Sequence, residues 1–161
     1  MQFRLFETAV YTRRRSQLIK KMSSGLIILM GNEESSMNYK DNWYPFRQDS
    51  NFLYYFGINT GSLAAVIDAD SGEEIIFGNE LTIEDIVWTG PLPSLGEMAA
   101  AVGVSKTKPY NQIETIIRNA INSGRQIYFT PPYRPENKIK LAQWLQVAVD
   151  AVSEMASVLL I

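Results

Sequence analysis

The sequence predicts an α/β domain in which helices flank a mixed β-sheet. Short apolar runs bounded by glycine, such as Leu26–Met30, are typical of buried strands. Leu63–Ala69 and Glu73–Gly78 are two strand-like runs separated by the turn Asp70-Ser71-Gly72, which predicts an antiparallel hairpin. Because segments with helical spacing or capping residues lie before and after these runs, the fold class is α/β. The hairpin makes the sheet mixed.

The N-terminal part of the chain is predicted to contain a helix, two strands and a long loop. Residues 4–23 place apolar side chains near helical spacing, with basic side chains toward solvent. The strand Leu26–Met30 follows, and the polar residues 31–44 predict a loop. The aromatic-rich segment 51–56, closed by Gly57, predicts a second strand ahead of the hairpin.

A helix is predicted directly after the hairpin. It covers Leu81–Trp88, with Ile83, Ile86 and Val87 expected to face the core. Gly90-Pro91-Leu92-Pro93 ends this helix, because proline lacks an amide donor and fixes the backbone.

Capping-box patterns predict the next two helices. The pattern occurs twice, as Ser94 with Glu97 and as Asn111 with Glu114. The first predicts a helix over Leu95–Val102, and the second a helix that extends to Ser123.

The last predicted elements are a strand over Gln126–Thr130 and a helix that begins near Pro135. Residues 138–161 are helix-like throughout, and the sequence stops inside the apolar run Val158–Ile161. Chain ends normally lie at the surface, where such a run is unfavourable. We therefore expect residues 1–161 to form a single domain that continues into a further domain downstream.

Composition excludes several classes of function. The 161 residues include 15 Lys+Arg and 17 Asp+Glu, and this net charge of −2 argues against a dedicated nucleic-acid binder. The chain has no Cys and no His, which removes disulfides, thiolate nucleophiles, His-based triads and the usual zinc sites. Taken alone, this chain is a poor candidate for an enzyme.

The ends of the chain carry no targeting signal that the sequence reveals. Its first 22 residues lack an apolar region followed by a small-residue cleavage site, so a secretory signal is not predicted. No apolar run approaches the roughly 18 residues of a membrane span. A cytoplasmic location without a membrane partner is the resulting expectation.

Charged clusters have ordinary interpretations. Arg13-Arg14-Arg15 with Lys20-Lys21 could bind phosphate, but consecutive residues point in different directions around a helix, so we expect a solvated face. The carboxylate pairs Glu33-Glu34, Glu73-Glu74 and Glu84-Asp85 do not predict a metal site, because hard metals need oxygens that converge from several elements.

The segment Trp43–Gly57 packs aromatic residues around one arginine and one acidic residue. A stacking platform for bases is conceivable, but a single cation supports it weakly. We expect Arg47 to tie several backbone carbonyls, or Asp49, in a partly buried loop. On this interpretation, Arg47→Ala lowers the melting temperature.

The same segment carries a family resemblance. Residues 44–57, Y-P-F-R-Q-D-S-N-F-L-Y-Y-F-G, closely resemble the signature of the N-terminal domain of the aminopeptidase P (Xaa-Pro aminopeptidase) family, within the creatinase/prolidase group. Other features agree in order, over about residues 4–130. They are Tyr11-x-x-Arg14-Arg15 with Leu18 and Met22, Gly31 with an Asn-containing loop, Asp85-Ile86-Val87-Trp88-Thr89-Gly90, and Ala101-Val102-Gly103-Val104.

The resemblance implies a ribonuclease H-like domain that is the non-catalytic N-terminal part of a two-domain enzyme. The parent would remove the N-terminal residue that precedes proline, using two divalent metal ions, usually manganese, in a downstream "pita-bread" domain. No cofactor, metal ligand or catalytic residue is then expected in this chain. The implied partners are its own catalytic domain, further copies in a dimer or tetramer, and proline-containing peptides, but not nucleic acid.

The resemblance also assigns roles to residues. It implies that this domain helps to build the subunit interface and to limit access to the active site, with Trp88 at the substrate entrance. A role for Trp88 as a simple anchor beside Gly90 stays open, and Pro91-Leu92-Pro93 departs from the basic residues common there in the family. The structural motif of the domain comprises Arg47, Gln48, Asp49, Ser50, Phe52, Tyr54, Gly57 and Gly90.

Three other functions stay open. One is that of a prolidase or creatinase relative, since the distinguishing residues lie in the downstream domain. Another is a non-catalytic binding module whose peptidase-like domain has lost its metals. Nucleic-acid binding rests on fold analogy alone.

Overall fold

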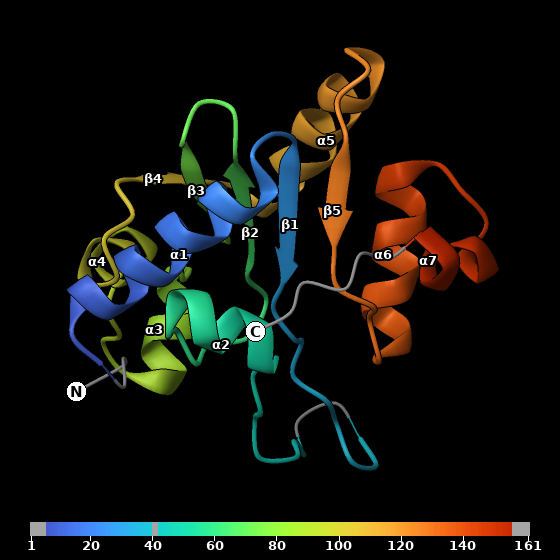
Figure 1. Ribbon diagram of the computed structural model, residues 1–161. Helices are drawn as coiled ribbons and strands as arrows, with labels where there is room; N and C mark the ends of the chain where they lie inside the picture. Colours follow the sequence, from blue (N-terminus) through green and yellow to red (C-terminus); the bar gives the residue numbers. More distant parts are fainter. Residues whose placement is uncertain (1–5, 40–41, 156–161) are drawn as a thin grey trace.

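A five-stranded mixed sheet in the order β4-β3-β2-β1-β5 lies at the centre of the structure (Figure 1). The computed structural model describes residues 6–39 and 42–155. The strands are β1 (Leu26–Met30), β2 (Ala64–Asp68), β3 (Glu74–Phe77), β4 (Lys106–Lys108) and β5 (Ile127–Phe129). The β1–β2 and β2–β3 pairs are antiparallel, whereas β5 is parallel to β1 and β4 is parallel to β3. The predicted hairpin and the predicted mixed sheet are therefore confirmed.

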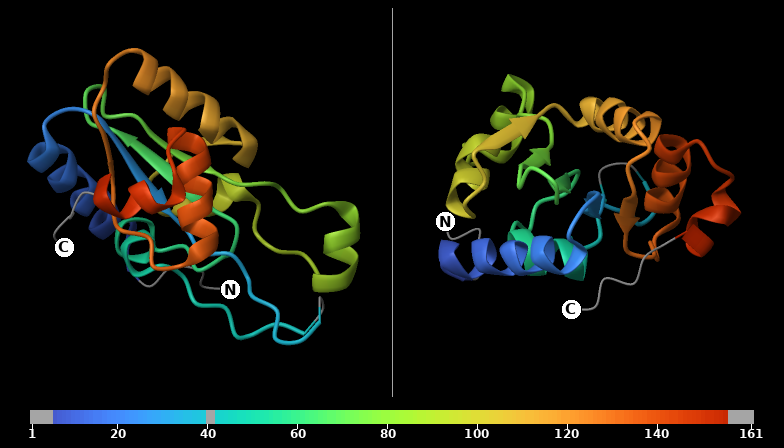
Figure 2. Two further views of the ribbon diagram at one scale, coloured as in Figure 1. Left: turned by 90° about the vertical axis from the view of Figure 1, so that its right-hand side faces the viewer. Right: turned by 45° about the horizontal axis from the view of Figure 1, so that its top comes forward.

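Helices cover both faces of the sheet, as Figure 2 (right) shows. One face packs against α1 (Thr8–Met22), α2 (Ser50–Phe56) and α4 (Leu95–Ala101). The other face packs against α5 (Ile113–Asn122), α6 (Pro135–Leu145) and α7 (Val149–Met155). Alternate residues of a strand point to opposite faces, so Ile27 and Leu29 join the first core and Leu26 and Ile28 join the second.

The segment 51–56 forms most of helix α2, so the prediction of a strand there is wrong. Asp49 caps the helix, since its carboxylate accepts hydrogen bonds from the amides of Asn51 and Phe52. The helix ends at Gly57, whose φ is +65°. A short apolar run fits a strand or a buried helix equally well, and here the cap and the terminal glycine favour the helix.

Helix α3 (Ile83–Thr89) lies where a helix was expected, but its apolar residues do not face the core. Ile83 is 84% exposed, Val87 is 75% exposed and Ile86 is 43% exposed. The capping box of Ser94 and Glu97 is confirmed at α4. A capping box at Asn111 and Glu114 is not present, because a 3-10 turn over Tyr110–Gln112 leads directly into α5.

The C-terminal helix was expected to be continuous, and the structure divides it. Gln146 has a φ of +56°, and this left-handed residue ends α6 before α7 begins. The polar strand β4 was not predicted, because its sequence Lys-Thr-Lys lacks the apolar run by which the other strands are recognised. Residue 4, where the first helix was expected to begin, and the apolar run 158–161 lie outside the described residues.

The basic cluster of α1 is only partly solvated, contrary to expectation. The Arg15 side chain is fully buried, and its guanidinium bonds to the Glu74 carboxylate, the Tyr55 carbonyl and the Val102 carbonyl at 2.8, 2.9 and 2.7 Å. Burial lowers the pKa of Arg15, and Glu74 opposes this shift. The Arg14 guanidinium lies 4.0 Å from the centroid of the Tyr54 ring. Both arginines join helices to the rest of the domain.

Candidate functional site

Helix α3 projects from the body of the domain, at the right-hand end of the left view in Figure 2. Its first turn is fixed by a capping box, in which the Asp85 amide donates to the Thr82 hydroxyl at 3.1 Å and the Asp85 carboxylate accepts from the Thr82 amide at 2.9 Å. Hydrogen bonds from Thr82 lower the pKa of Asp85. At the other end the Gly90 amide donates to the Ile86 carbonyl, and Gly90 has a φ of +79°. Local interactions therefore hold this helix without a large buried face.

Trp88 is the most prominent side chain of this helix. It is 81% exposed, and Ile83 and Val87 on the same short helix are also exposed. A tryptophan buried in the core or packed as an anchor would be largely covered, so this exposure disagrees with an anchoring role. Several exposed apolar side chains on one short element are typical of an interaction surface.

The motif around residue 48 forms a buried polar network at the carboxyl end of β1. Gln48 is only 4% exposed, and all of its hydrogen-bonding positions are used. Its Oε1 accepts from the amides of Asn32 and Asp49 at 2.8 and 3.1 Å. Its Nε2 donates to the carbonyls of Ile58 and Thr60 at 3.0 and 2.9 Å. One side chain thereby joins the segments before and after α2 to the segment that follows β1.

Arg47 does not take the structural role that the sequence suggested for it. Its side chain is exposed, and within residues 6–39 and 42–155 no hydrogen bond or ion pair holds the guanidinium. Only its backbone carbonyl takes part in the network, by accepting from Asn32 Nδ2 at 3.0 Å. The neighbouring Gln48 ties the loop instead.

Asn32 is the member of the network that sequence reasoning did not single out. It is fully buried, and its Nδ2 also donates to the Tyr133 hydroxyl at 3.0 Å. Its Oδ1 accepts from the Asn137 side chain at 3.1 Å. Tyr133 and Asn137 are about a hundred residues away from Asn32 in sequence, so no local pattern predicts these contacts. The only signal in the sequence for a role of Asn32 is its position directly after Gly31.

The remaining motif residues build and seat helix α2. Burial raises the pKa of Asp49, and the amides of Phe52 and Asn51 oppose this shift. Ser50 opens the helix, and Phe52 is fully buried in the core. Tyr54 lies under the Arg14 guanidinium. A Cβ added at Gly57 would overlap the ring of Tyr11, so the close contact between α2 and α1 requires glycine there.

A charged cluster continues the network toward α6. The Lys140 ammonium bonds to the Glu33 carboxylate and, at 3.0 Å, to the Tyr110 hydroxyl. Burial opposes the charge of Lys140, but these bonds outweigh it and raise its pKa. The Arg134 guanidinium donates to the Glu33 carbonyl at 3.0 Å. The cations and carboxylates of this cluster are paired with each other, which is the arrangement of a structural network.

The described part of the chain offers no place for the metal ions that the resemblance implies for the parent. It contains no group of three or more acidic side chains that could hold an ion, and the sequence has no His or Cys. Among the described helices, none is both long and apolar enough to cross a membrane.

Curated relatives include an Xaa-Pro dipeptidase and an Xaa-Pro aminopeptidase. The chain is 23% identical over 116 residues to the Xaa-Pro dipeptidase of Homo sapiens, and the match covers 68% of this chain and 24% of the relative. It is 25% identical over 123 residues to the Xaa-Pro aminopeptidase of Escherichia coli strain K12, and the match covers 73% of this chain and 27% of the relative. The chain thus spans about a quarter of the length of these relatives.

Solved structures of aminopeptidases share the fold. Aminopeptidase P from E. coli, in its low-pH form, superposes with a TM-score of 0.74 at 20% identity, over 88% of this chain and 33% of the other. The Pseudomonas aeruginosa aminopeptidase PepP superposes with a TM-score of 0.75 at 23% identity, over 97% of this chain and 36% of the other.

The family model for the N-terminal domain of aminopeptidase P matches residues 11–128. This range begins in α1 and ends in β5, and it contains α3 and all the residues that Gln48 contacts by hydrogen bonds. The chain belongs to the aminopeptidase P N-terminal domain family.

Proposed function

We propose that residues 1–161 are the non-catalytic N-terminal domain of a metal-dependent Xaa-Pro aminopeptidase, which removes the residue preceding proline. The observation that carries this proposal is the exposed Trp88 on a rigidly capped helix, within a domain of the aminopeptidase P family. The domain would contribute to the subunit interface and would limit access to the active site.

Trp88 would form part of the entrance for the peptide substrate, beside the catalytic domain of a neighbouring subunit. Its indole is free to cover a second surface, because it is 81% exposed in the isolated domain. Ile83 and Val87 would then be buried against the same surface, which accounts for three apolar side chains in solvent. Aromatic residues contribute much of the binding energy at such interfaces.

The catalytic machinery would lie in a domain downstream of this chain. Two divalent metal ions, manganese in this proposal, would be held there, since the described residues of the present domain offer no suitable cluster. A cytoplasmic homo-oligomer, a dimer or tetramer acting on proline-containing peptides, completes the proposal.

A second candidate is a prolidase, because a dipeptidase of the Xaa-Pro type is among the relatives. A third is a binding module whose peptidase-like domain has lost its metals. The three differ in the downstream domain and in the length of the peptide that is cleaved.

The test uses the full-length parent protein with manganese, on an Xaa-Pro dipeptide, an Xaa-Pro-Xaa tripeptide and a longer Xaa-Pro peptide. We expect cleavage of the tripeptide and the longer peptide but not of the dipeptide. Cleavage of the dipeptide alone would favour the prolidase, and no cleavage of any peptide would favour the binding module.

The role of Trp88 is tested by Trp88→Ala in the same parent. We expect the ratio of kcat/KM for the longer peptide to that for the tripeptide to change by about tenfold, which corresponds to about 1.4 kcal/mol. Ile139→Ala removes an exposed apolar side chain from α6 and serves as the control. An unchanged ratio in Trp88→Ala would remove this residue from the entrance.

A further inference from the structure

The segment that contains Arg47 lies beside the segment that follows β1. The Tyr44 amide donates to the Ser35 carbonyl at 2.8 Å, and the Arg47 carbonyl accepts from Asn32 Nδ2 at 3.0 Å. The later residue of one segment is thus bonded to the earlier residue of the other, so the two segments run antiparallel. Tyr44 is 56% exposed and Arg47 is also exposed, and both side chains start from this supported stretch of chain.

Tyr133, just before α6, completes this surface. Its hydroxyl accepts from the same Asn32 Nδ2 at 3.0 Å, so the Tyr133 hydroxyl and the Arg47 carbonyl are neighbours. In Figure 1 the start of α6 lies beside the chain that leaves β1. Tyr133 is 67% exposed although its hydroxyl is bonded to a buried residue, so its ring is open to solvent. Tyr44, Arg47 and Tyr133 are called the tyrosine–arginine surface below.

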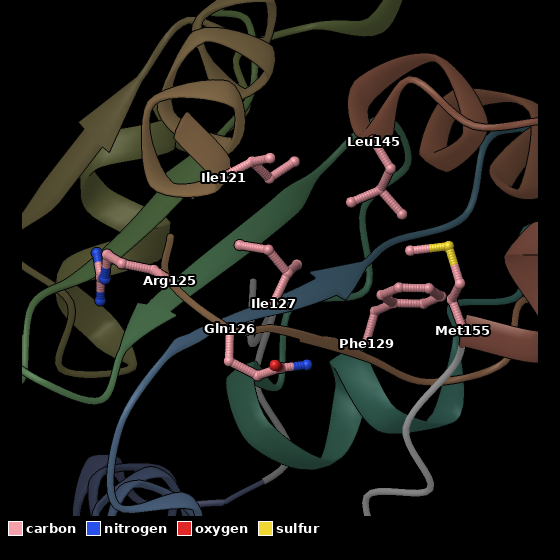
Figure 3. A pocket seen from close by; sticks show the side chains of 7 residues that line it. All are labelled: Ile121, Arg125, Gln126, Ile127, Phe129, Leu145 and Met155. Carbon is pink, nitrogen blue, oxygen red and sulfur yellow. The ribbon is translucent and has the colours of Figure 1, made fainter. Parts of the chain in front are cut away.

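Arg47 differs from other arginines in having no partner for its guanidinium in the part of the chain that the structure describes. The Arg134 guanidinium, close to the same surface, is paired with Glu136. The Arg125 guanidinium, beside the apolar cavity of about 390 Å³ in Figure 3, is bonded to two aspartates. A guanidinium presents its donors as a planar fork that fits a carboxylate. Arg47 is therefore available to a carboxylate of another molecule.

A buried network supports the tyrosine–arginine surface from below. Asn32 is fully buried and Gln48 is 4% exposed, and Gln48 Oε1 accepts from the Asn32 amide at 2.8 Å. Asn32 in turn donates to both Arg47 and Tyr133. A surface that is already ordered loses less conformational freedom when a ligand binds. Tyrosine and arginine are also enriched among the residues that contribute most to binding energy.

We propose that the tyrosine–arginine surface binds the C-terminal end of a proline-containing peptide. The rings of Tyr44 and Tyr133 would lie against a proline ring, and the Arg47 guanidinium would bind the terminal carboxylate. Proline-rich segments are pre-ordered and dock on aromatic surfaces, and carboxylates pair with arginine through two parallel hydrogen bonds. A peptide that ends in proline presents both groups on one residue. This inference rests on the proposed function, from which it takes the class of substrate.

The test is an NMR titration of residues 1–161 with short peptides. The probes are Ala-Pro-Ala-Pro with a free terminal carboxylate, the same peptide with a terminal amide, and Ala-Pro-Ala-Ala with a free carboxylate. Arg47→Ala is compared with Arg13→Ala, which removes an exposed arginine from α1 and is the matched control. Tyr44→Ala is compared with Tyr44→Phe, which keeps the ring. The spectra also show whether each variant is folded.

We expect the first peptide to shift the signals of the tyrosine–arginine surface in the natural chain. The terminal amide should weaken binding about fivefold, the effect of losing one exposed ion pair. Arg47→Ala should abolish this difference and Arg13→Ala should keep it. Binding should also be weaker for the peptide that ends in alanine, and this preference for proline should persist in Tyr44→Phe but disappear in Tyr44→Ala.

Equal affinity of the natural chain for the carboxylate and the amide would overturn the proposal, and this comparison needs no variant to fold. An acid–amide difference that persists in Arg47→Ala would also overturn it. Shifts of the same signals on dilution without peptide would assign the surface to a second copy of the chain instead. Because binding is measured without cleavage, its failure is distinct from a failure of the full-length parent to cleave Xaa-Pro peptides.

Discussion

Replacing Gln48 with alanine tests the conclusion that this side chain, and not its neighbour Arg47, holds the loop before α2. The substitution removes four hydrogen bonds. Two of their partners, the Asn32 amide and the Ile58 carbonyl, are in buried bonds, whereas the Thr60 carbonyl and the Asp49 amide are in partly buried ones. Water can reach the latter pair more easily after the substitution.

The size of the effect follows from the two buried groups. An unsatisfied buried polar group costs about 1–3 kcal/mol, so Gln48→Ala is expected to lower the free energy of unfolding by about 2–6 kcal/mol. For a chain of this length each kcal/mol moves the melting temperature by about 2–4 °C. The expected decrease is therefore at least about 4 °C. Denaturant titration and thermal unfolding followed by circular dichroism measure both quantities.

Arg47→Ala is the matched control, because it alters the adjacent residue. The Arg47 side chain is exposed, and the alanine variant keeps the backbone carbonyl that accepts from Asn32. The free energy of unfolding should therefore change by no more than about 0.5 kcal/mol. A loss below about 1 kcal/mol in Gln48→Ala, or a similar loss in Arg47→Ala, would refute the assignment of the loop to Gln48.

Two further predictions concern the same helix. Asp49 has a raised pKa in the folded chain, so its ionisation opposes folding, and stability should fall as the pH rises from about 4 through the folded pKa. Asp49→Asn keeps a capping oxygen but cannot ionise. Between pH 4 and pH 7 the melting temperature of the natural chain should therefore fall relative to that of the variant. Melting temperatures that change in parallel with pH would contradict this. Gly57→Ala should cost more than Gly72→Ala, because both have positive φ but only the Cβ at residue 57 meets the buried Tyr11 ring. Gly72→Ala should lower the free energy of unfolding by about 1–2 kcal/mol, the cost of the strained backbone alone, and Gly57→Ala should lower it clearly more. Denaturant titration measures both losses. Equal losses would show that Tyr11 moves aside freely.

Local signals in the sequence determined part of this fold. The turn Asp70-Ser71-Gly72 needs only nearby residues to reverse the chain, and the hairpin around it was predicted with nearly the observed bounds. The capping box of Ser94 is a contact over three residues and was also predicted. The signature over residues 44–57 identified the family before any long-range contact was known.

The segment 51–56 shows where the pattern of apolar residues alone is insufficient. Its aromatic residues suit a strand or a helix, and the Asp49 cap, the terminal Gly57 and the burial of its aromatic side chains in the core favour the helix. In α3 the pattern of apolar residues suggested a buried face, yet no element covers Ile83, Val87 and Trp88 in the described structure. Periodicity shows which side chains share a face but not whether another element packs on it.

The roles of polar residues were decided only by tertiary structure. Arg15 and Arg14 stand in one basic run, but Arg15 reaches the carbonyls of Tyr55 and Val102, which are 40 and 87 residues away. Asn32 likewise forms hydrogen bonds with the side chains of Tyr133 and Asn137, at separations of 101 and 105 residues. The sequence by itself therefore determined the family, the hairpin and the capping box of Ser94, because these depend on neighbouring residues. The burial of Arg15, the network of Gln48 and the exposure of Trp88 depend on distant segments meeting, and no local pattern specifies that.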